Sequence, residues 1–342
     1  MSRYEALQES LRLRPRTWLV TGAAGFIGSH LVETLLKLNQ RVKGLDNLAT
    51  GRLSNLEDVR RQVGEVAWGR FEFTEGDIRS LETCTQAMAG VDAVLHQAAL
   101  GSVPRSIQNP IASHQSNVDG FLNMLWVAKE QGIGNFVFAS SSSVYGDDPR
   151  LPKVEAQTGL PLSPYALTKS INEQYARVFR ETYGLNSCGL RYFNVFGPRQ
   201  NPGGPYAAVI PRWIKALMRG ETCSIFGDGE TSRDFCYVGN AVQANLLAGC
   251  LPPEAEGGIF NVSYGGKTSL TSLYALIRER VAESRPSISG LKADYLPARS
   301  GDIRDSQADL TRTSAILRYD PTHSVIQGLD QTIPWFLARP ES

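Results

Sequence analysis

Residues 17–28 have the sequence TWLVTGAAGFIG, and this stretch decides the fold. Its apolar start predicts a buried strand, and Gly22, Gly25 and Gly28 then form a GxxGxxG turn. The apolar residues of segment 26–40 recur with the spacing of one helix face. A glycine turn between a strand and a helix lets the backbone approach a diphosphate, whose charge the helix N-terminus receives. The sequence therefore predicts the first βα unit of a dinucleotide-binding sheet.

Strand and helix patterns alternate through the first half of the chain, which is typical of a doubly wound parallel α/β sheet. Further strands are expected at 41–47, 71–78, 91–99, 135–141 and 187–195, with helices at 81–90, 111–132 and 165–183. After residue 195 the sequence is richer in Gly and Pro, which predicts a second unit. We therefore expect a helix within 1–15, a Rossmann domain over 16–194 and a smaller α/β substrate-binding unit over 195–342. The chain of the second unit is free to cross back to the first.

Composition excludes several classes of protein. The 35 basic and 34 acidic side chains balance to a net charge of +1, unlike a typical nucleic-acid-binding protein. No run approaches the roughly 20 apolar residues of a membrane span, and the first residues carry no secretory signal. The five Cys and four His residues have neither a CxxC nor an HExxH spacing, so we expect no metal site. The sequence thus predicts a cytoplasmic protein without nucleic-acid or membrane partners.

An acidic residue lies where a dinucleotide-binding fold needs one. Asp46 ends the second predicted strand, 18 residues after Gly28, and can accept hydrogen bonds from an adenosine ribose. No arginine follows it directly, which favours NAD over NADP. Two more predicted strands end at the same carboxyl edge of the sheet, one in Asp77-Ile78 and the other in Gln97-Ala98-Ala99. The predicted NAD contacts of these motifs are Gly22, Gly25, Phe26, Ile27, Gly28, Asp46, Asn47, Asp77, Ile78, Gln97, Ala98 and Ala99.

A second group of residues has the chemistry of a reacting centre. Tyr165 and Lys169 are four residues apart on a predicted helix and therefore share one face. A tyrosine with its ordinary pKa of about 10 is a poor base, and a nearby ammonium favours the phenolate. Four serines, 140–143, end the strand before this helix, where their hydroxyls can bond a substrate alcohol or ketone. Because no GxSxG motif is present, these features indicate a tyrosine base rather than a serine hydrolase.

Taken in order, these motifs resemble the extended short-chain dehydrogenase/reductases that modify nucleotide sugars. The resemblance is carried by TGAAGFIG, Asp46, HQAA, SSSVYG and YALTK, and it extends over nearly the whole chain. Within this family, HQAALGSVPRSI, LPKVE and PYAAVIPRW are most similar to the bacterial UDP-N-acetylglucosamine 4-epimerases. The resemblance implies NAD-dependent inversion of a UDP-sugar at C4 through a 4-keto intermediate, for surface polysaccharide synthesis.

The resemblance also implies a role for each matching position. Tyr165 would be the general base, and Lys169 its electrostatic partner and a nicotinamide-ribose ligand. Ser141 would bind the sugar 4-hydroxyl, with Ser142 and Ser143 near the same ring. The family pattern adds Ser116 and Phe193 to the NAD contacts. The other substrate contacts would be Gly101, Ser102, Asn194, Gln200, Ala208, Val209, Ser224, Ile225, Phe226, Arg233, Arg299, Asp302 and Ser306.

The position of Ser306 bears on the choice of sugar. In galactose-type epimerases this position resembles a tyrosine, whereas Ser306 and Ala208 are small and leave room for a 2-acetamido group. We therefore expect the interconversion of UDP-GlcNAc and UDP-GalNAc. The motif SSSSVYG also resembles 4-epimerases of UDP-hexuronic acids, in which Arg304 would meet a carboxylate, so this alternative stays open.

Two further expectations concern partners and activity. The family implies a homodimer formed through helices near 107–131 and 165–183. A non-catalytic dinucleotide sensor is a remoter alternative, because such proteins often lose the tyrosine or the lysine that this chain keeps.

Overall fold

Seven parallel strands form the main sheet, in a computed structural model that describes residues 2–203, 207–252, 255, 257–298 and 304–339. They are β1 (Thr17–Thr21), β2 (Arg41–Asp46), β3 (Phe71–Glu75), β4 (Ala93–His96), β5 (Asn135–Ser141), β6 (Ser187–Tyr192) and β11 (Gly258–Val262). Their order is β11-β6-β5-β4-β1-β2-β3, so the direction of the winding reverses between β1 and β4. This order confirms the doubly wound sheet that the sequence predicts. Such sheets bind ligands at the carboxyl ends of the strands beside the reversal.

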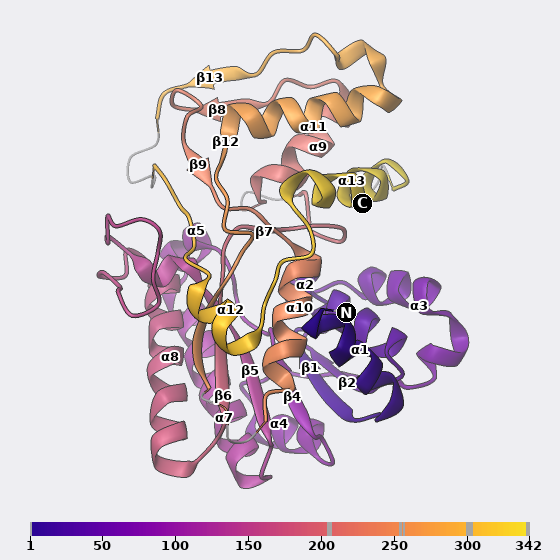
Figure 1. Cartoon of the computed structure of the whole chain (residues 1–342), viewed down its shortest axis with the longest axis vertical. Coiled ribbons are helices and arrows are strands. Elements are labelled where there is room, and N and C mark those ends of the chain that lie inside the picture. The colour runs from indigo at the N-terminus through magenta and orange to yellow at the C-terminus, as the bar shows by residue number, and fades with distance from the viewer. Residues whose placement is uncertain (1, 204–206, 253–254, 256, 299–303, 340–342) are drawn as a thin grey trace.

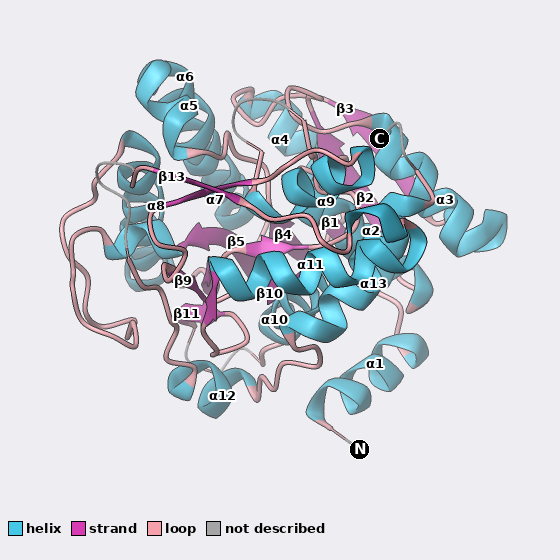
Figure 2. Cartoon of the chain, turned by 90° about the horizontal axis from the view of Figure 1, so that it is seen from above, coloured by secondary structure: helices cyan, strands magenta, loops and turns pink. Residues whose placement is uncertain are grey.

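Helices cover both faces of the main sheet (Figure 2). On one face lie α4 (Leu81–Met88), α7 (Gly120–Glu130) and α8 (Pro164–Tyr183), and on the other α2 (Phe26–Lys37), α3 (Leu53–Trp68) and α10 (Val238–Gly249). Along β1, Trp18 and Val20 pack toward the α2 and α10 layer, whereas Leu19 packs toward the α7 layer. Successive side chains of a strand point to opposite faces, so the apolar run of β1 is buried on both sides.

The segment predicted as one helix over 111–132 is interrupted by a π-helical turn. It follows α5 (Val103–Gln108) and consists of α6 (Pro110–His114), η1 (Gln115–Asp119) and α7. The backbone stays helical through η1, but the wider π turn places an extra residue in the helix. This turn contains Ser116, and turns of this kind frequently occur at functional sites.

A second lobe lies beyond the carboxyl edge of the main sheet (Figure 1). Its core is formed by α9 (Val209–Arg219), α11 (Leu270–Ser284) and α13 (Val325–Leu337). Three short strand pairs accompany these helices. They are β7 (Val195–Phe196) with β10 (Cys236–Tyr237), β8 (Ser224–Phe226) with β13 (Asp294–Leu296), and β9 (Ser232–Arg233) with β12 (Thr268–Ser269). The smaller elements are α1 (Arg3–Leu13), α12 (Thr311–Leu317) and the 3-10 helices η2 (Ser142–Tyr145) and η3 (Pro286–Ile288).

The chain returns from the second lobe to the main sheet. β11 pairs in parallel with β6, and α10 packs on the same face as α2. Figure 1 shows α10 and α12 beside the strands of the main sheet, below the second lobe. Residues 238–249, 258–262 and 311–317 therefore lie with the sheet although they come after residue 195 in sequence. Among the described helices, none combines the length and apolar character that a bilayer crossing requires.

Candidate active site

The glycine turn is packed too tightly for any larger residue at its end. Gly22 has a φ of +68°, a conformation that favours glycine, and its N–H donates 2.8 Å to the carbonyl of Leu45. A Cβ on Gly28 would lie 2.0 Å from the carbonyl oxygen of Gly22. Gly25 is the N-cap of α2, whose first N–H groups have no partner within the helix. The turn therefore offers backbone donors at a point that no side chain covers, as a diphosphate requires.

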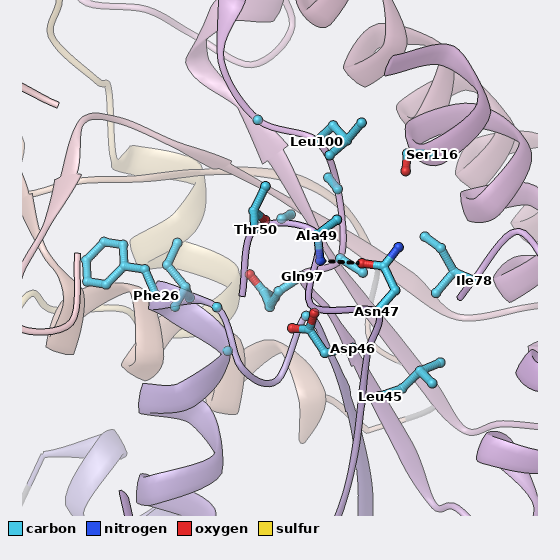
Figure 3. Close-up of a pocket in the computed structure, with 18 of the residues that line it drawn as sticks. Phe26, Leu45, Asp46, Asn47, Ala49, Thr50, Ile78, Gln97, Leu100 and Ser116 are labelled. Carbon is cyan, nitrogen blue, oxygen red and sulfur yellow. Dashed lines mark hydrogen bonds between the residues drawn. The ribbon is translucent and has the colours of Figure 1, made fainter. Parts of the chain in front are cut away.

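A cavity of 260 Å³, which we call the glycine-turn cavity, lies in front of this turn at the carboxyl edge of the sheet. Figure 3 shows Phe26 on one side of it and Ile78 and Ser116 on the other, with Asp46 and Gln97 between them. The predicted NAD contacts that line it are Gly22, Gly25, Phe26, Ile27, Gly28, Asp46, Asn47, Ile78, Gln97, Ala98, Ala99, Ser116, Tyr165 and Lys169. The sheet thus brings residues from most of the first half of the chain to one cavity.

Asp46 is fixed at the end of β2 by two backbone donors. Its Oδ2 accepts from the N–H of Ala24 at 3.0 Å, and its Oδ1 from the N–H of Leu48 at 2.8 Å. Burial raises the pKa of this carboxyl group, and the two N–H groups oppose that rise. The carboxylate lines the cavity and is positioned to accept hydrogen bonds from the hydroxyls of a ribose.

Tyr165 and Lys169 both line the glycine-turn cavity from α8. The Nζ of Lys169 lies 6.0 Å from the centroid of the Tyr165 ring and donates 2.8 Å to the carbonyl oxygen of Ala139. Tyr165 is half-buried and its side chain hydrogen-bonds that of Ser141, while Lys169 is 3% exposed. Tyr165 and Lys169 are therefore held against the end of β5.

Burial has the largest effect on the electrostatics of this pair. Burial raises the pKa of Tyr165, and the hydrogen bond with Ser141, rather than Lys169, opposes that rise. Burial also lowers the pKa of Lys169 to about 8, against the charge of Glu173, which raises it. Lys169 is thus not among the groups that shift the pKa of Tyr165 here, and its predicted effect on the phenolate stays a prediction. Desolvation dominates both groups because they lie in the interior.

The serines that end β5 have different surroundings. Ser141 caps the following turn, where its Oγ accepts from the N–H of Ser143 at 3.1 Å. Ser142 begins η2. In the described part of the chain, the buried Oγ of Ser143 has no hydrogen-bond partner. Ser140, the first of the four serines noted in the sequence, lines the glycine-turn cavity and donates 2.5 Å to Glu173.

A larger cavity of 880 Å³, which we call the outer cavity, adjoins the first one. The two cavities share Gly25, Phe26, Thr50 and Gly101 in their linings. Four predicted sugar contacts line the outer cavity: Gly101, Ser102, Gln200 and Ala208. The outer cavity therefore has the location expected of a substrate site beside a cofactor site.

The predicted uridine and diphosphate contacts lie in the second lobe and its connections. Val209 begins α9, and Ser224, Ile225 and Phe226 form β8. Arg233, in β9, donates 3.2 Å to the carbonyl of Arg304, and the N–H of Ser306 donates 3.2 Å to the carbonyl of Ser232. Asn194 precedes β7 and donates 3.3 Å to the carbonyl of Asp234. Arg299 and Asp302 lie outside the described residues.

Two predicted NAD contacts do not line the glycine-turn cavity. Phe193 is fully buried and packs on Tyr145, with the ring centroids 5.9 Å apart. Asp77 instead accepts 2.8 Å from the amide of Asn47, and hydrogen bonds from Arg79 lower its pKa to about 2. Both residues follow their strand ends in sequence, but the Phe193 side chain packs in the interior and that of Asp77 bonds Asn47 of the cavity wall.

Sequence reasoning missed several residues that line the cavity. They are Leu45, Ala49, Thr50, Gly76, Leu100, Ala139 and Tyr192. Tyr192 donates 3.0 Å to Gln97, and Asn245 of α10 donates 2.7 Å to Tyr192 and accepts 3.0 Å from Gln97. This three-residue network fixes Gln97 at the cavity wall. Its partner Asn245 comes from beyond residue 195, so spacing within the first half of the chain could not reveal it.

Comparison with known proteins identifies the family. The family model described as the NAD dependent epimerase/dehydratase family matches residues 18–263. The chain belongs to this family. It is 37% identical to the UDP-glucose 4-epimerase of Mycolicibacterium smegmatis over 321 residues, which cover 93% of this chain and 97% of the relative.

Solved structures of epimerases share the fold of this protein. A UDP-N-acetylglucosamine 4-epimerase from Methanobrevibacter ruminantium M1, in complex with UDP-N-acetylmuramic acid, is 36% identical with a TM-score of 0.85. The match covers 95% of this chain and 99% of that one. A UDP-glucuronic acid 4-epimerase from Bacillus cereus, in complex with UDP-glucuronic acid and NAD, is 29% identical with a TM-score of 0.82, covering 94% and 99%.

The residues of this NAD dependent epimerase/dehydratase fit its cofactor. The glycine turn, which admits no larger residue at Gly28, suits the diphosphate, and the fixed carboxylate of Asp46 suits the adenosine ribose. Tyr165 and Lys169 line the same cavity further along the edge of the sheet. NAD is thus the cofactor, and its reacting end would lie beside the tyrosine.

Proposed function

We propose that this protein interconverts UDP-GlcNAc and UDP-GalNAc by inverting C4 of the sugar. The observation that carries the chemistry is that Tyr165 and Lys169 line the same cavity as the glycine turn. A base placed there can act on a hydroxyl of a sugar that enters through the adjoining outer cavity. The relatives named above all act at C4 of a UDP-sugar by their descriptions, which supports this reaction type.

The side chains divide the chemistry between them. Tyr165 takes the proton of the C4 hydroxyl and later returns a proton to the new hydroxyl. Ser141 bonds the phenol and is placed to share the same hydroxyl. Lys169 stabilises the phenolate form of Tyr165, which is the form that can take this proton. NAD, held along the glycine-turn cavity, would supply reversible hydride transfer at C4 of the sugar.

Small side chains support the acetylated sugar. Ala208 lines the outer cavity, and Ser306 is half-buried at the edge of β9. Both side chains are small, and we assign the space beside them to the 2-acetamido group of the sugar. The likeness to a structure described as a UDP-N-acetylglucosamine 4-epimerase agrees with this choice.

A UDP-hexuronic acid is the alternative substrate, supported by the likeness to a UDP-glucuronic acid 4-epimerase. In that reaction Arg304 would meet the carboxylate of the sugar. The Arg304 side chain is 74% exposed and forms an ion pair with Asp228 at 3.4 Å, which weighs against that role. We therefore place the N-acetylhexosamine first.

The test is to incubate the purified protein, without added cofactor and with added NAD, with each of four UDP-sugars. They are UDP-GlcNAc, UDP-GalNAc and the two corresponding uronic acids, with UDP-glucose as a further comparison. We expect the epimer of each N-acetylhexosamine to accumulate to equilibrium, as seen by chromatography. At least tenfold higher kcat/KM for UDP-glucose or for a uronic acid than for UDP-GlcNAc would contradict the proposed substrate.

A further inference from the structure

Glu173 continues the line of Tyr165 and Lys169 along α8, one helical turn further on. Its Oε1 accepts a 2.5 Å hydrogen bond from the hydroxyl of Ser140. Lys169 bonds the carbonyl oxygen of Ala139, the preceding residue of the same strand. The helix is therefore joined to the end of β5 by a carboxylate as well as by the ammonium.

The carboxylate of Glu173 is fixed by a buried arginine. Arg191 of β6 donates to both of its oxygens, from Nε at 2.9 Å and from Nη2 at 2.7 Å. The two side chains are 4% and 11% exposed. The guanidinium also donates 3.1 Å to the carbonyl of Glu155 and lies 4.7 Å from the centroid of the Tyr145 ring. A bidentate pair held on so many sides has a single orientation.

The negative charge of Glu173 stabilises the ammonium of Lys169, which has few other groups to stabilise it. Lys169 faces Tyr165 and Glu173 on α8, His96 on β4 and the carbonyl of Ala139 on β5. His96 is neutral because burial lowers its pKa to about 3. Among the described residues, Glu173 is the charged group that raises the pKa of Lys169 against its burial.

A cavity of 540 Å³ opens on the far side of Glu173. The other charged groups that line it are Glu155, Arg177, Arg180, Arg191 and Arg312. Arg191 donates its bidentate bond to Glu173, and no arginine of this cavity is among the groups that shift the pKa of Lys169. Glu173 thus separates the lysine from the arginines.

We propose that Glu173 is a positioning residue of the reaction: its carboxylate, fixed by Arg191, keeps the ammonium of Lys169 charged beside Tyr165. Glu173 also has a second effect, because the hydrogen bond that it accepts from Ser140 holds the end of β5 against α8. This inference rests on the proposed function, in which Tyr165 is the base and Lys169 its partner. Glu173 itself touches neither substrate nor cofactor in this scheme.

The test removes the charge while keeping the shape, with Glu173→Gln. Glu181→Gln is the matched control, because Glu181 lies on the same helix but is 60% exposed and pairs only loosely with Arg177, at 3.6 Å. The pKa of Lys169 is measured by NMR on protein labelled with 13C at the lysine Cε, with the signal assigned by Lys169→Met. We expect Glu173→Gln to lower this pKa by roughly one unit, and Glu181→Gln to leave it unchanged.

The same change is expected in the pH profile of kcat. The alkaline limb of Glu173→Gln moves toward lower pH by the same amount, while KM for UDP-GlcNAc stays within about twofold, because the substrate contacts are untouched. A pKa of Lys169 and an alkaline limb that both stay at the wild-type position in folded Glu173→Gln would overturn the proposal.

A second variant covers the case in which Glu173→Gln does not fold, because it leaves a buried arginine without its counter-ion. Glu173→Gln with Arg191→Gln removes both charges together and is expected to fold and to show the same lowered pKa. A wild-type pKa in this folded double variant would also overturn the proposal. Failure of the proposed function is distinct: there the wild-type protein itself would not epimerise UDP-GlcNAc, whatever the NMR titration gives.

Discussion

The ammonium of Lys169 lies 2.8 Å from the main-chain carbonyl oxygen of Ala139, although the side chain is almost fully buried. A carbonyl dipole replaces only part of the hydration that a charged amine has in water. The protein therefore keeps a costly charge next to Tyr165, and a reaction that uses the phenolate of Tyr165 as its base explains why it does so.

Replacing Lys169 by Met should separate stability from activity. A pKa of about 8 instead of 10.5, at about 1.4 kcal/mol per unit, means that burial costs the ammonium roughly 3 kcal/mol. We expect Lys169→Met to be at least as stable as the wild type at pH 7, and to lose kcat by two orders of magnitude or more. Urea unfolding and turnover measurements check both expectations, and a variant with near-normal turnover would contradict them.

The same lysine predicts how stability depends on pH. Because its folded pKa is lowered, the unfolded chain binds the extra proton between pH 8 and 10.5. The free energy of unfolding of the wild type should therefore rise across this window relative to that of Lys169→Met. Urea titrations of both proteins at several pH values measure the difference, and parallel curves would argue against a buried ammonium.

Tyr165→Phe should abolish turnover and spare binding. The phenyl ring keeps the packing of α8, while the hydroxyl that takes the proton and bonds Ser141 is lost. We expect kcat to fall by roughly 10²–10⁴-fold, the usual contribution of a general base, with the Kd for UDP-sugar within a few-fold. Turnover within tenfold of the wild type would mean that another group is the base.

Gly28→Ala should destroy cofactor binding. The added methyl would lie 2.0 Å from the carbonyl oxygen of Gly22, so the turn must open. Gly290→Ala is the matched control, because a Cβ there meets nothing within 4 Å. We expect calorimetry to show NAD binding weakened at least a hundredfold in the first variant and unchanged in the second. Equal binding by both would contradict the assignment of the turn.

Ser306→Tyr should change the choice of sugar. A phenol at this position would take the space that we assign to the 2-acetamido group. We expect kcat/KM for UDP-GlcNAc to fall at least tenfold relative to that for UDP-glucose, with Ser306→Ala as the control that adds no volume. The ratio of the two kcat/KM values is the measurement, and an unchanged ratio in Ser306→Tyr would remove Ser306 from the sugar site.

The homodimer expected from the family predicts a role for apolar residues on α6 and α8. Ile111 is 70% exposed and Leu167 is 50% exposed, and both line an apolar groove. We expect Ile111→Glu with Leu167→Glu to shift the protein from dimer to monomer in light scattering. Leu13→Glu, at an exposed leucine of α1, is the control that should stay dimeric. A wild-type monomer would contradict the expectation.

The sequence predicts the main sheet well because its signals are local. The strand, turn and helix around Gly22 are adjacent in the chain, and their periodicities are clear. The pairing of β11 with β6 depends on contacts between distant segments, which periodicity does not report. The π turn at Ser116 likewise changes the helix by a single residue and leaves the apolar spacing readable as an ordinary helix.

The candidate site is predicted less completely, for electrostatic reasons. Residue types and spacing place Tyr165 and Lys169 on one helix face, but they do not show that burial controls both pKa values. Glu173 could have been found by extending the same spacing by one helical turn, since Tyr165, Lys169 and Glu173 follow one another at intervals of four residues. Its partner Arg191 could not, because the pairing joins a helix to a separate strand.

The return of β11 to the main sheet has a consequence for biosynthesis. While the nascent polypeptide leaves the ribosome, β6 has no neighbour on its outer side until residues 258–262 have been translated. An unpaired parallel edge is a template for mispairing with other chains, and slowly completed sheets are exposed to this hazard. A gene truncated near codon 194 would therefore encode an aggregating fragment rather than an independent nucleotide-binding module.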